Sequence, residues 1–444
     1  MNKPAREQHI NETGVVADLT HDAEGVVREA DAGGKIAFVA GALPGERIRF
    51  RRRGFHKSHD EADLVEIIEA SPHRVTPRCA HFGVCGGCAL QHLDPAAQIE
   101  AKQKELASNL ERIGNVAPDE WLPPLLGPHW NYRRRARLSS RFVTKKDRSL
   151  VGFREKQGRY VADVQRCEVL AEPVASLVGA LADLLTSMAR WSSIPQIEVA
   201  LSDGEQVLVV RVLDPLPDAD LDKLREFERA HSLRILLQPG GLDTITPLTP
   251  GPVDLHYRLD DFDLKLAFGP TDFVQVNAAI NQAMVARAIE LLEIGPTDRV
   301  LDLYCGLGNF TLPLARRARG VVGVEGEAGL IARARANAHL NGISNAEFVV
   351  ADLSVAPDVT LPWMRGGFDQ VLLDPPRVGA REVLSAVAHL APRRVVYISC
   401  HTGSLARDLG VLTHELGFRL RAAGVLDMFP HTTHVESIAV LDRN

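Results

Sequence analysis

The chain has 444 residues, 45% of them hydrophobic, a length that predicts two or three domains. Its six cysteines are too few and too unevenly spaced for a secreted disulfide framework, and no run reaches the roughly 18 apolar residues of a membrane span. The N-terminal sequence MNKPAREQHI lacks an apolar signal core, so we expect a cytoplasmic protein. The net charge of −6 argues against indiscriminate nucleic-acid binding. Residues 1–150 nevertheless hold 23 basic against 20 acidic residues, so basic character is concentrated there.

Short apolar runs separated by turn residues occupy residues 14–70, and this rhythm predicts a small antiparallel barrel of the OB kind. In one run Ile48 and Phe50 alternate with Arg47, Arg49 and Arg51. Period-two alternation places the apolar pair inside and the arginines on one outer face. That face could follow a phosphate backbone; an arginine-rich solvated strand is the alternative.

Three cysteines, Cys79, Cys85 and Cys88, lie on one glycine-containing loop, and Cys167 could supply a fourth thiolate from elsewhere in the chain. Four thiolates suit either tetrahedral zinc or an iron–sulfur cluster, and the spacing alone does not choose between them. Cysteines buried without any metal are the remaining alternative.

The segment between 95 and 265 combines three patterns. Apolar residues at helical spacing predict a helix over 95–115 that docks on another domain. The basic run 130–137, flanked by Trp130 and Tyr132, could stack on or pair with RNA, with a solvated surface as the alternative. Residues 170–260 alternate helical and strand patterns and are expected to form an α/β insert.

From about residue 266 onward apolar strands alternate with helices, which predicts a doubly wound, mostly parallel sheet. The first strand ends at Asp302 and is followed by Gly306 and Gly308, whose missing side chains let the backbone approach a ligand. Asn309 and Thr311 can then open a helix. Glu325 and Asp352 follow the next two strands, so an acid stands at each strand end. The ladder indicates a nucleoside cofactor, S-adenosyl-L-methionine; a nucleotide oxidoreductase or an inert sheet is the alternative.

Two further strands end in reactive residues. Asp374 opens the sequence DPPR after the fourth strand, and Cys400 ends the strand VVYISC after it. DPP alone would suit amino-group methylation, whereas a thiol at this edge favours methylation of carbon 5 of uracil. That carbon becomes nucleophilic only when a thiolate adds to carbon 6. A base must later remove the carbon-5 proton, and Glu436 is our candidate.

Taken together, these residues resemble the RNA uracil-C5 methyltransferase family over nearly the whole chain. The matching segments are FVQVN (273–277), DLYCGLGNF (302–310), GVE (323–325), DPPR (374–377), YISC (397–400) and HVES (434–437). The resemblance implies a Rossmann-like class I methyltransferase domain over 266–444, with Cys400 as nucleophile and Glu436 as base. It also implies a set of residues lining the cofactor and base pocket: Gln275, Tyr304, Gly306, Gly308, Asn309, Glu325, Asp352 and Asp374.

The same resemblance implies the substrate side of the site. Phe273 would stack on or near the flipped base and Asp374 would hydrogen-bond its imide edge. Cys305 is expected to serve packing only. The family further implies that Cys79, Cys85, Cys88 and Cys167 hold a [4Fe–4S] cluster in a central domain over 71–265, with zinc as the weaker alternative.

The N-terminal barrel, over 1–70, resembles the TRAM domain that such enzymes use to hold RNA. Barrel and cysteines together favour the branch that methylates a uridine of 23S ribosomal RNA over transfer-RNA enzymes, which we expect to lack both. The expected partner is therefore 23S rRNA, with no membrane and no obligate protein partner. The alternatives are the same chemistry on transfer RNA or another ribosomal uridine, and a non-catalytic iron–sulfur RNA-binding protein.

Overall fold

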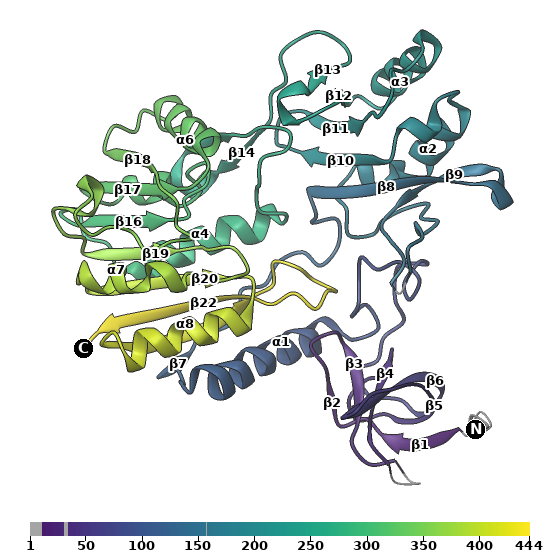
Figure 1. The fold of residues 1–444 in the computed structure, drawn as a ribbon, viewed down its shortest axis with the longest axis horizontal. Helices are drawn as coiled ribbons and strands as arrows, with labels where there is room; N and C mark the ends of the chain where they lie inside the picture. Colours follow the sequence, from purple (N-terminus) through teal and green to yellow (C-terminus); the bar gives the residue numbers. More distant parts are fainter. Residues whose placement is uncertain (1–10, 31–33, 157) are drawn as a thin grey trace, which may run out of the picture. The chain divides into compact units, whose positions relative to one another are not determined.

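The computed structural model describes residues 11–30, 34–156 and 158–444. The chain forms two compact units (Figure 1). Unit 1 comprises Met1–Lys102 and Pro430–Thr433, and unit 2 comprises Gln103–Phe429 and His434–Asn444. Among the described residues, no helix has both the length and the apolar character needed to cross a membrane.

Unit 1 contains a curled six-stranded sheet in the order β1-β5-β6-β4-β3-β2. A bridge between Gly14 and Ala30 joins its first strand to the residues after β3, so the sheet is compatible with a barrel. The pair β4–β6 is parallel, so the prediction of a wholly antiparallel barrel was wrong at that pair. The strands are β1 (Glu12–Val15), β2 (Asp18–Leu19), β3 (Glu24–Val27), β4 (Ile36–Ala40), β5 (Arg47–Phe55) and β6 (His59–Glu69).

Strand β5 follows the predicted alternation. Ile48 and Phe50 are fully buried in the core of this sheet, and Arg51 is exposed. The outer arginines face an acidic strand, because β5 pairs with β6 in a register that sets Arg49 opposite Glu66. Arg49 and Glu66 form an ion pair. The arginine face is therefore largely neutralised by its neighbour, a feature that period-two alternation could not reveal.

The predicted helix over 95–115 is α1 (Pro95–Asn109), continued by a π-helical turn, η1 (Leu110–Gly114). Asp94 caps its start by accepting a hydrogen bond from the backbone N–H of Ala97 at 3.0 Å. Asn115, at φ 50°, ends the turn. Within unit 2, Gly114 lies so close to α8 that a Cβ there would be 2.4 Å from the carbonyl oxygen of Ala406.

Unit 2 contains an eight-stranded sheet in the order β18-β17-β16-β19-β20-β22-β21-β7. The strands β18, β17, β16, β19 and β20 are parallel to one another, while β22 is antiparallel to both β20 and β21. The sheet is therefore mostly parallel, as predicted, and the antiparallel pairs are those of β22, the last strand in the sequence. The strands are β7 (Glu120–Trp121), β16 (Arg299–Leu303), β17 (Gly320–Glu325), β18 (Ala346–Val350), β19 (Gln370–Leu373), β20 (Arg394–Ser399), β21 (Phe418–Leu426) and β22 (Glu436–Arg443).

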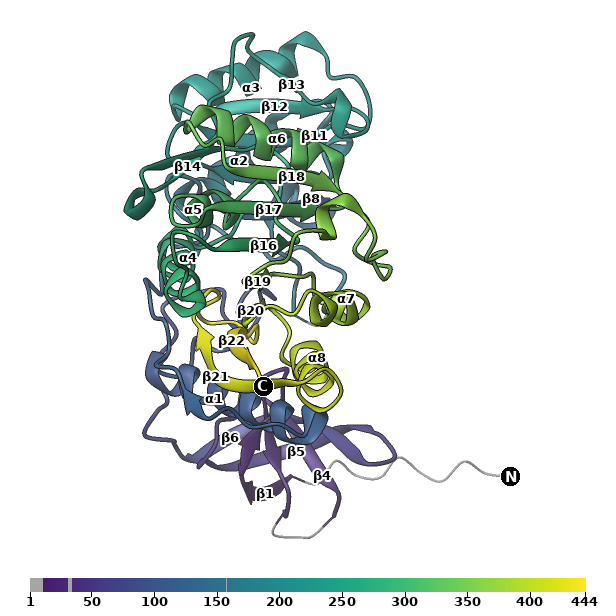
Figure 2. The same ribbon diagram turned by 90° about the vertical axis from the view of Figure 1, so that its left-hand side faces the viewer.

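Helices cover both faces of this sheet, in keeping with strands β16, β17, β19 and β20, which are almost entirely buried and mostly apolar. In Figure 2, α4 and α5 lie on one side and α7 and α8 on the other. The helices are α4 (Ala278–Leu292), α5 (Thr311–Ala315), α6 (Ala328–Leu340), α7 (Leu384–His389) and α8 (Thr402–His414). Such double coverage leaves the carboxyl ends of the parallel strands as the edge where a ligand can bind.

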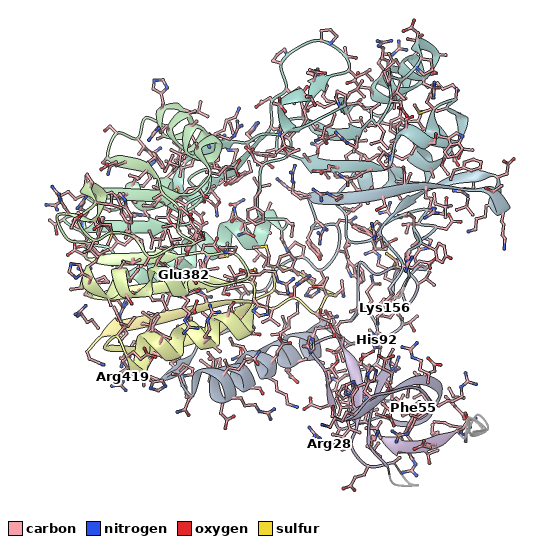
Figure 3. All side chains as sticks on the ribbon, viewed as in Figure 1. Arg28, Phe55, His92, Lys156, Glu382 and Arg419 are labelled. Atoms are coloured by element: carbon pink, nitrogen blue, oxygen red, sulfur yellow. The ribbon has the colours of Figure 1, made fainter. Side chains whose placement is uncertain are left out.

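A second sheet of unit 2, in the order β13-β12-β11-β10-β8-β9, carries the predicted α/β insert. Its helices are α2 (Val174–Ser187) and α3 (Asp218–Ala230), and Lys156, labelled in Figure 3, lies on the loop that follows β9. The strands are β8 (Arg135–Val143), β9 (Arg148–Gly152), β10 (Gln196–Leu201), β11 (Gln206–Arg211), β12 (Arg234–Gln238) and β13 (Thr246–Pro247).

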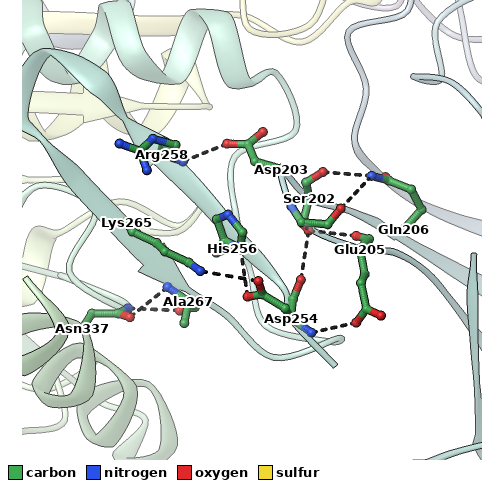
Figure 4. Close-up of polar contacts among 11 residues, drawn as sticks. Ser202, Asp203, Glu205, Gln206, Asp254, His256, Arg258, Lys265, Ala267 and Asn337 are labelled. Atoms are coloured by element: carbon green, nitrogen blue, oxygen red, sulfur yellow. Dashed lines mark hydrogen bonds and ion pairs between the residues drawn. The ribbon is translucent and has the colours of Figure 1, made fainter. Parts of the chain in front are cut away.

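The two sheets of unit 2 are linked through the hairpin β14 (His256–Leu259) and β15 (Leu264–Ala267). Asp203, in the turn between β10 and β11, accepts the backbone N–H of Arg258 at 2.9 Å (Figure 4). Asn337 of α6 bonds to the backbone of Ala267 in both directions. One hydrophobic cluster runs from Val207 in the insert to strand β20, so the insert and the eight-stranded sheet share a core. The three-domain division stays a prediction.

Candidate active site

The structure brings five predicted residues to one edge of the large sheet. Glu325 ends β17, Asp374 directly follows β19, and Cys400 directly follows β20. Asp302 is the penultimate residue of β16, and Asp352 lies two residues beyond β18. Because these five strands are parallel, their carboxyl ends meet along a single edge.

The loop after β16 turns back sharply over this edge. Tyr304, Gly306 and Gly308 all have positive φ, at 65°, 55° and 98°. The backbone N–H groups of Tyr304 and Cys305 donate to the carbonyl of Val324, which holds the loop against β17. A Cβ at Gly306 would meet open space, so glycine there is required by backbone conformation and leaves room beside the loop.

Asp302 is fully buried beneath this loop, and the hydroxyl of Thr311 donates to its carboxyl at 2.5 Å. Burial, with the nearby charges of Asp374 and Glu325, raises the pKa of Asp302 to about 8. At neutral pH this carboxyl is therefore mostly protonated. It shapes the loop by holding the first residue of α5 and lies below the surface where a ligand would bind.

Glu325 is the acid that faces the loop directly. Its carboxylate accepts the backbone N–H groups of Gly306 at 3.2 Å, Gly326 at 2.8 Å and Glu327 at 3.1 Å. Three fixed donors orient the carboxylate and keep it half-buried at the end of β17. Its remaining lone pairs can accept hydrogen bonds from a ribose diol.

Asn309 differs from the expectation that it helps to open a helix. Its side chain exchanges two hydrogen bonds with Asn281 of α4, at 2.9 and 3.0 Å, and accepts the hydroxyl of Tyr257 at 2.8 Å. Thr311 begins α5 instead. The amide of Asn309 therefore links the loop after β16 to α4, a long-range contact that the local sequence did not reveal.

The remaining predicted lining residues are more exposed. Asp352 is exposed and accepts hydrogen bonds from Ser354, which lower its pKa, so it stays ionised at neutral pH. Phe273 has 73% of its surface exposed and offers an aromatic face to solvent, while Gln275 is half-buried. Phe273 therefore has the exposure that stacking on an extruded base requires.

Arg135 holds the segment around Phe273, which the sequence interpretation missed. Its guanidinium donates to the carbonyls of Pro270 at 2.7 Å and Asp272 at 3.0 Å. The backbone N–H of Arg134 bonds the carbonyl of Val276 at 2.8 Å. This part of the basic run 130–137 therefore supports the site from within the protein, and its sequence signal was only a cluster of arginines.

Cys400 and Glu436 stand next to each other across two strands. In the β20–β22 ladder Ser399 pairs with Ser437, so the next positions along the two strands are Cys400 and Glu436. Cys400 is half-buried, and Glu436 has 3% of its surface exposed. The register thus sets the two residues opposite each other although 35 residues separate them in the sequence.

The pKa values of Cys400, Asp374 and Glu436 in this site are raised. Burial, with the charges of Glu436 and Asp374, raises the pKa of the Cys400 thiol to about 11, while the Arg377 guanidinium acts in the opposite direction. Burial raises the pKa of Asp374 to about 7 and, with the charge of Asp374, raises the pKa of Glu436 well above its ordinary value. Thiol and carboxyl therefore carry protons in the resting protein. Strongly shifted pKa values of this kind are typical of sites that carry out acid–base chemistry.

Arg377 lies on a stiff loop, and the sequence analysis gave it no role. The hydroxyl of Ser404 donates to its carbonyl at 2.9 Å, and the backbone N–H of Ala380 donates to Asp408 at 2.7 Å. Asp408 also accepts the hydroxyl of Tyr397 at 2.7 Å. The loop is therefore fixed to α8. The position of Arg377 in the DPPR motif was the sequence signal that could have identified this residue.

The cysteine loop lies in unit 1 and Cys167 in unit 2. The backbone N–H of Gly87 donates to the sulfur of Cys85 at 3.4 Å, an arrangement that suits a metal-bound thiolate. Among the described residues, no three or more histidine, cysteine or acidic side chains are grouped so that they could hold a metal ion. Cys305 is buried beside β17, in agreement with a packing role.

Comparison with known proteins identifies related chains. The family model described as tRNA (Uracil-5-)-methyltransferase matches residues 96–444. Two proteins named 23S rRNA (uracil(1939)-C(5))-methyltransferase RlmD, from Xanthomonas axonopodis pv. citri and Stenotrophomonas maltophilia, are 53% and 54% identical to this chain. Each alignment covers 96% of this chain and 96% of the relative.

A solved structure extends the comparison to the fold. The Pyrococcus abyssi tRNA (uracil-54, C5)-methyltransferase, in complex with S-adenosyl-L-homocysteine, is 26% identical, with a TM-score of 0.72. The match covers 97% of this chain and all of that one. It must therefore include the N-terminal sheet, so the expectation that transfer-RNA enzymes lack this region was wrong. With a family model over 96–444 and relatives more than half identical over nearly its full length, the chain belongs to the RNA uracil-C5 methyltransferase family.

Proposed function

We propose that the chain methylates carbon 5 of uridine 1939 of 23S rRNA, the position that its most similar relatives carry in their names. Identity of 53–54% to those relatives supports this substrate over a transfer-RNA uridine, because the transfer-RNA enzyme from P. abyssi is only 26% identical. The N-terminal sheet no longer discriminates between the two, and the proposal rests on overall identity.

In the proposed reaction, the thiolate of Cys400 adds to carbon 6 of the uracil, forming a carbon–sulfur bond and an enolate. Carbon 5 of the enolate would then take the methyl group of S-adenosyl-L-methionine, while the bond between that group and the cofactor's sulfur breaks and leaves S-adenosyl-L-homocysteine. The carboxylate of Glu436 removes the carbon-5 proton, the ring double bond re-forms, and the carbon–sulfur bond breaks to release the thiolate. The base must leave its stack to reach Cys400, and Phe273 would receive it.

The cofactor would lie along the edge formed by the Gly306 loop and Glu325. The open space beside Gly306 and the fixed carboxylate of Glu325 fit the adenosine part of S-adenosyl-L-methionine. Once bound, the cofactor would supply the methyl group and a positive charge. Arg377 would help to ionise the thiol, since its charge opposes the rise in the pKa of Cys400.

The observation that carries the proposal is the register of β20 and β22. It sets a nucleophilic thiol beside a buried carboxyl at the carboxyl edge of the sheet. A degenerate, non-catalytic RNA-binding protein would have no need of this pair.

A covalent trap tests this mechanism. With 23S rRNA fragments containing 5-fluorouridine, methyl transfer leaves no proton for Glu436 to remove, so a protein–RNA adduct through Cys400 should persist. Cys400→Ala should give neither adduct nor methylation while retaining cofactor binding. Glu436→Gln should accumulate the adduct on unmodified RNA. Methylation by Cys400→Ala would contradict the role of the thiol, and wild-type protein that binds cofactor without forming adduct would favour a binding protein.

The transfer-RNA alternative is supported by the solved enzyme that covers 97% of this chain. Parallel assays on a 23S rRNA fragment and on a transfer-RNA transcript would decide between the two. We expect the ribosomal fragment to be methylated at least tenfold faster. The reverse preference would reassign the substrate without altering the chemistry.

We further propose that Cys79, Cys85, Cys88 and Cys167 hold a [4Fe–4S] cluster in the central domain, with the barrel of residues 1–70 acting as a TRAM-like RNA-binding domain and 266–444 as the catalytic domain. Support comes from the thiolate donor set and the N–H···S contact at Cys85. Anaerobically purified protein should contain four irons and four acid-labile sulfides per chain, both lost in Cys88→Ser. Stoichiometric zinc would show a different metal.

A further inference from the structure

The most basic stretch of the chain lies around the β8–β9 hairpin of unit 2. Residues 133–160 hold eleven Lys and Arg against two Asp and Glu, in a chain whose net charge is −6. The sequence analysis singled out only the start of this stretch, residues 130–137. The structure separates it into two parts with different roles.

The first part is engaged by contacts with the protein's own residues. Arg135 supports the segment around Phe273, Arg134 pairs with Asp203 at 2.5 Å, and Arg137, whose side chain is 68% exposed, pairs with Glu198 at 2.9 Å. The two carboxylates compensate the charges of Arg134 and Arg137. Contact of residues 130–137 with RNA stays a prediction.

The second part is exposed and uncompensated. Five cations point outward from the end of the hairpin and the loop after it, and within the described part of the chain none of them forms an ion pair: Arg141, Lys145, Arg154, Lys156 and Arg159. Two more cations, Lys146 and Arg148, share the carboxylate of Asp163. An excess of positive charge therefore remains at this surface.

The backbone that carries these cations is well held. Arg141 pairs with Leu150 in the β8–β9 ladder, and Phe142 stacks on Trp191 with ring centroids 4.3 Å apart. The loop after β9 is closed by the hydrogen bond from the N–H of Glu155 to the carbonyl of Tyr160 at 3.0 Å. These contacts hold the β8–β9 ladder and join the two ends of the loop.

An exposed aromatic ring accompanies the cations. Tyr160, at the end of the loop, has 64% of its surface exposed. Cations that follow a phosphate backbone, together with an aromatic face for an unstacked base, are the combination that sequence-tolerant RNA binding uses. In Figure 1 the outer end of the hairpin lies at the border of unit 2, away from β20.

We propose that the β8–β9 hairpin and the described residues 153–156 and 158–160 after it form a docking surface for the phosphate backbone of the RNA substrate, outside the catalytic pocket. The inference rests on the proposed function and adds the surface that holds the RNA. The partner is RNA because a fixed row of unpaired cations complements a polyanion, and release of its counterions drives binding. An acidic protein and an anionic membrane are the other outcomes of the test.

The test uses the full-length protein with the triple variant Arg154→Gln, Lys156→Gln, Arg159→Gln. The matched control removes three exposed, unpaired arginines elsewhere in unit 2: Arg190→Gln, Arg317→Gln and Arg319→Gln. Methylation of a long 23S rRNA fragment and of a short oligonucleotide around the target uridine is measured from 0.05 to 0.3 M salt.

We expect the triple variant to raise KM for the long fragment about tenfold near 0.15 M salt and to lower the slope of log KM against log salt by about 2. Its kcat should stay within twofold of wild type, and its activity on the short oligonucleotide should match the control. Equal KM and slope in the two variants would overturn the inference.

Other results distinguish the remaining possibilities. Wild-type protein that methylates neither RNA would refute the proposed function; the inference would then be judged by direct binding to the long fragment, where an unchanged dissociation constant in the triple variant would refute it too. Loss of binding to phosphatidylglycerol vesicles or to a polyglutamate peptide, with RNA binding unchanged, would assign the surface to a different partner and overturn the inference.

Discussion

Two arginine-rich regions look alike in sequence and differ in what their charges do. Strand β5 in unit 1 lies beside the acidic strand β6, and its arginines are paired: Arg49 with Glu66, Arg51 with Asp63, Arg52 with Glu12 and Asp60, and Arg53 with Glu61 and Asp63. In the β8–β9 hairpin of unit 2, which is described throughout, the partner strand β9 contains no acidic residue, and the ion pairs of its outer cations are those of Lys146 and Arg148 with Asp163.

The contrast shows that the count of basic residues in a segment does not identify an RNA-binding surface. What matters is whether the neighbouring strand supplies carboxylates at the register positions that face the cations. In β5 the charges contribute to folding, whereas in the hairpin they remain available to a polyanion. The predictions below test this division of roles.

The largest effect is expected at Arg52, a largely buried arginine of β5. Its side chain is 11% exposed and bonds Glu12 and Asp60 at 2.8 Å each. Arg52→Ala leaves Glu12 without this cation and Asp60 with only the more distant Lys35, at 3.8 Å, and should cost about 3 kcal/mol of stability. Urea denaturation would measure it, with Arg141→Ala of the hairpin as control at less than about 0.5 kcal/mol. Equal losses in both variants would break the comparison.

A smaller, pH-dependent effect is expected at Glu46, also in unit 1. Burial opposes ionisation, but hydrogen bonds from Arg74, Leu43 and Ser71 outweigh it and lower the pKa of Glu46. A folded pKa below the unfolded value of about 4.3 stabilises the fold above that pH, and the stabilisation disappears as the pH falls through the folded value. The stability difference between wild type and Glu46→Gln should therefore shrink from about 1–2 kcal/mol at pH 7 toward zero near pH 3. A difference independent of pH would assign it to packing.

The smallest effect tests whether β5 can be turned into a binding strand. Glu66→Gln removes the carboxylate that pairs with Arg49 on the exposed face. If neutralisation is what keeps β5 from binding RNA, affinity for a long 23S rRNA fragment should rise about two- to threefold at low salt, with a steeper salt dependence. Filter binding across a salt series would measure it. Unchanged affinity would show that β5 lies outside the RNA-binding surface even without its acidic partner.

The candidate site shows the same division between local pattern and long-range pairing. The positions of Glu325, Asp374 and Cys400 after their strands were predictable, because buried parallel strands are short apolar runs and their carboxyl ends share one edge. The adjacency of Cys400 and Glu436 was not, because it depends on β22 inserting between β20 and β21. Chemistry alone suggested that a base was needed there.

Other contacts of the site also required the folded chain. Asn309 was expected at a helix start, but its amide bonds Asn281 and Tyr257 from two distant segments. Asp302 was predicted only as one of the acids at the strand ends, and the folded chain buries it under the loop, bonded to Thr311. Both residues are polar and lie in or next to the loop after β16. Only the packing of α4 and α5 determines where their polar atoms point.

By itself the sequence determined the strand–helix alternation of 266–444, the inward face of β5 and the family to which the chain belongs, because periodicity and short motifs are encoded locally. Only the tertiary structure decided which charges are cancelled and which meet solvent. Strand register and the order of strands in a sheet join residues far apart along the chain, and local spacing carries no record of those partners.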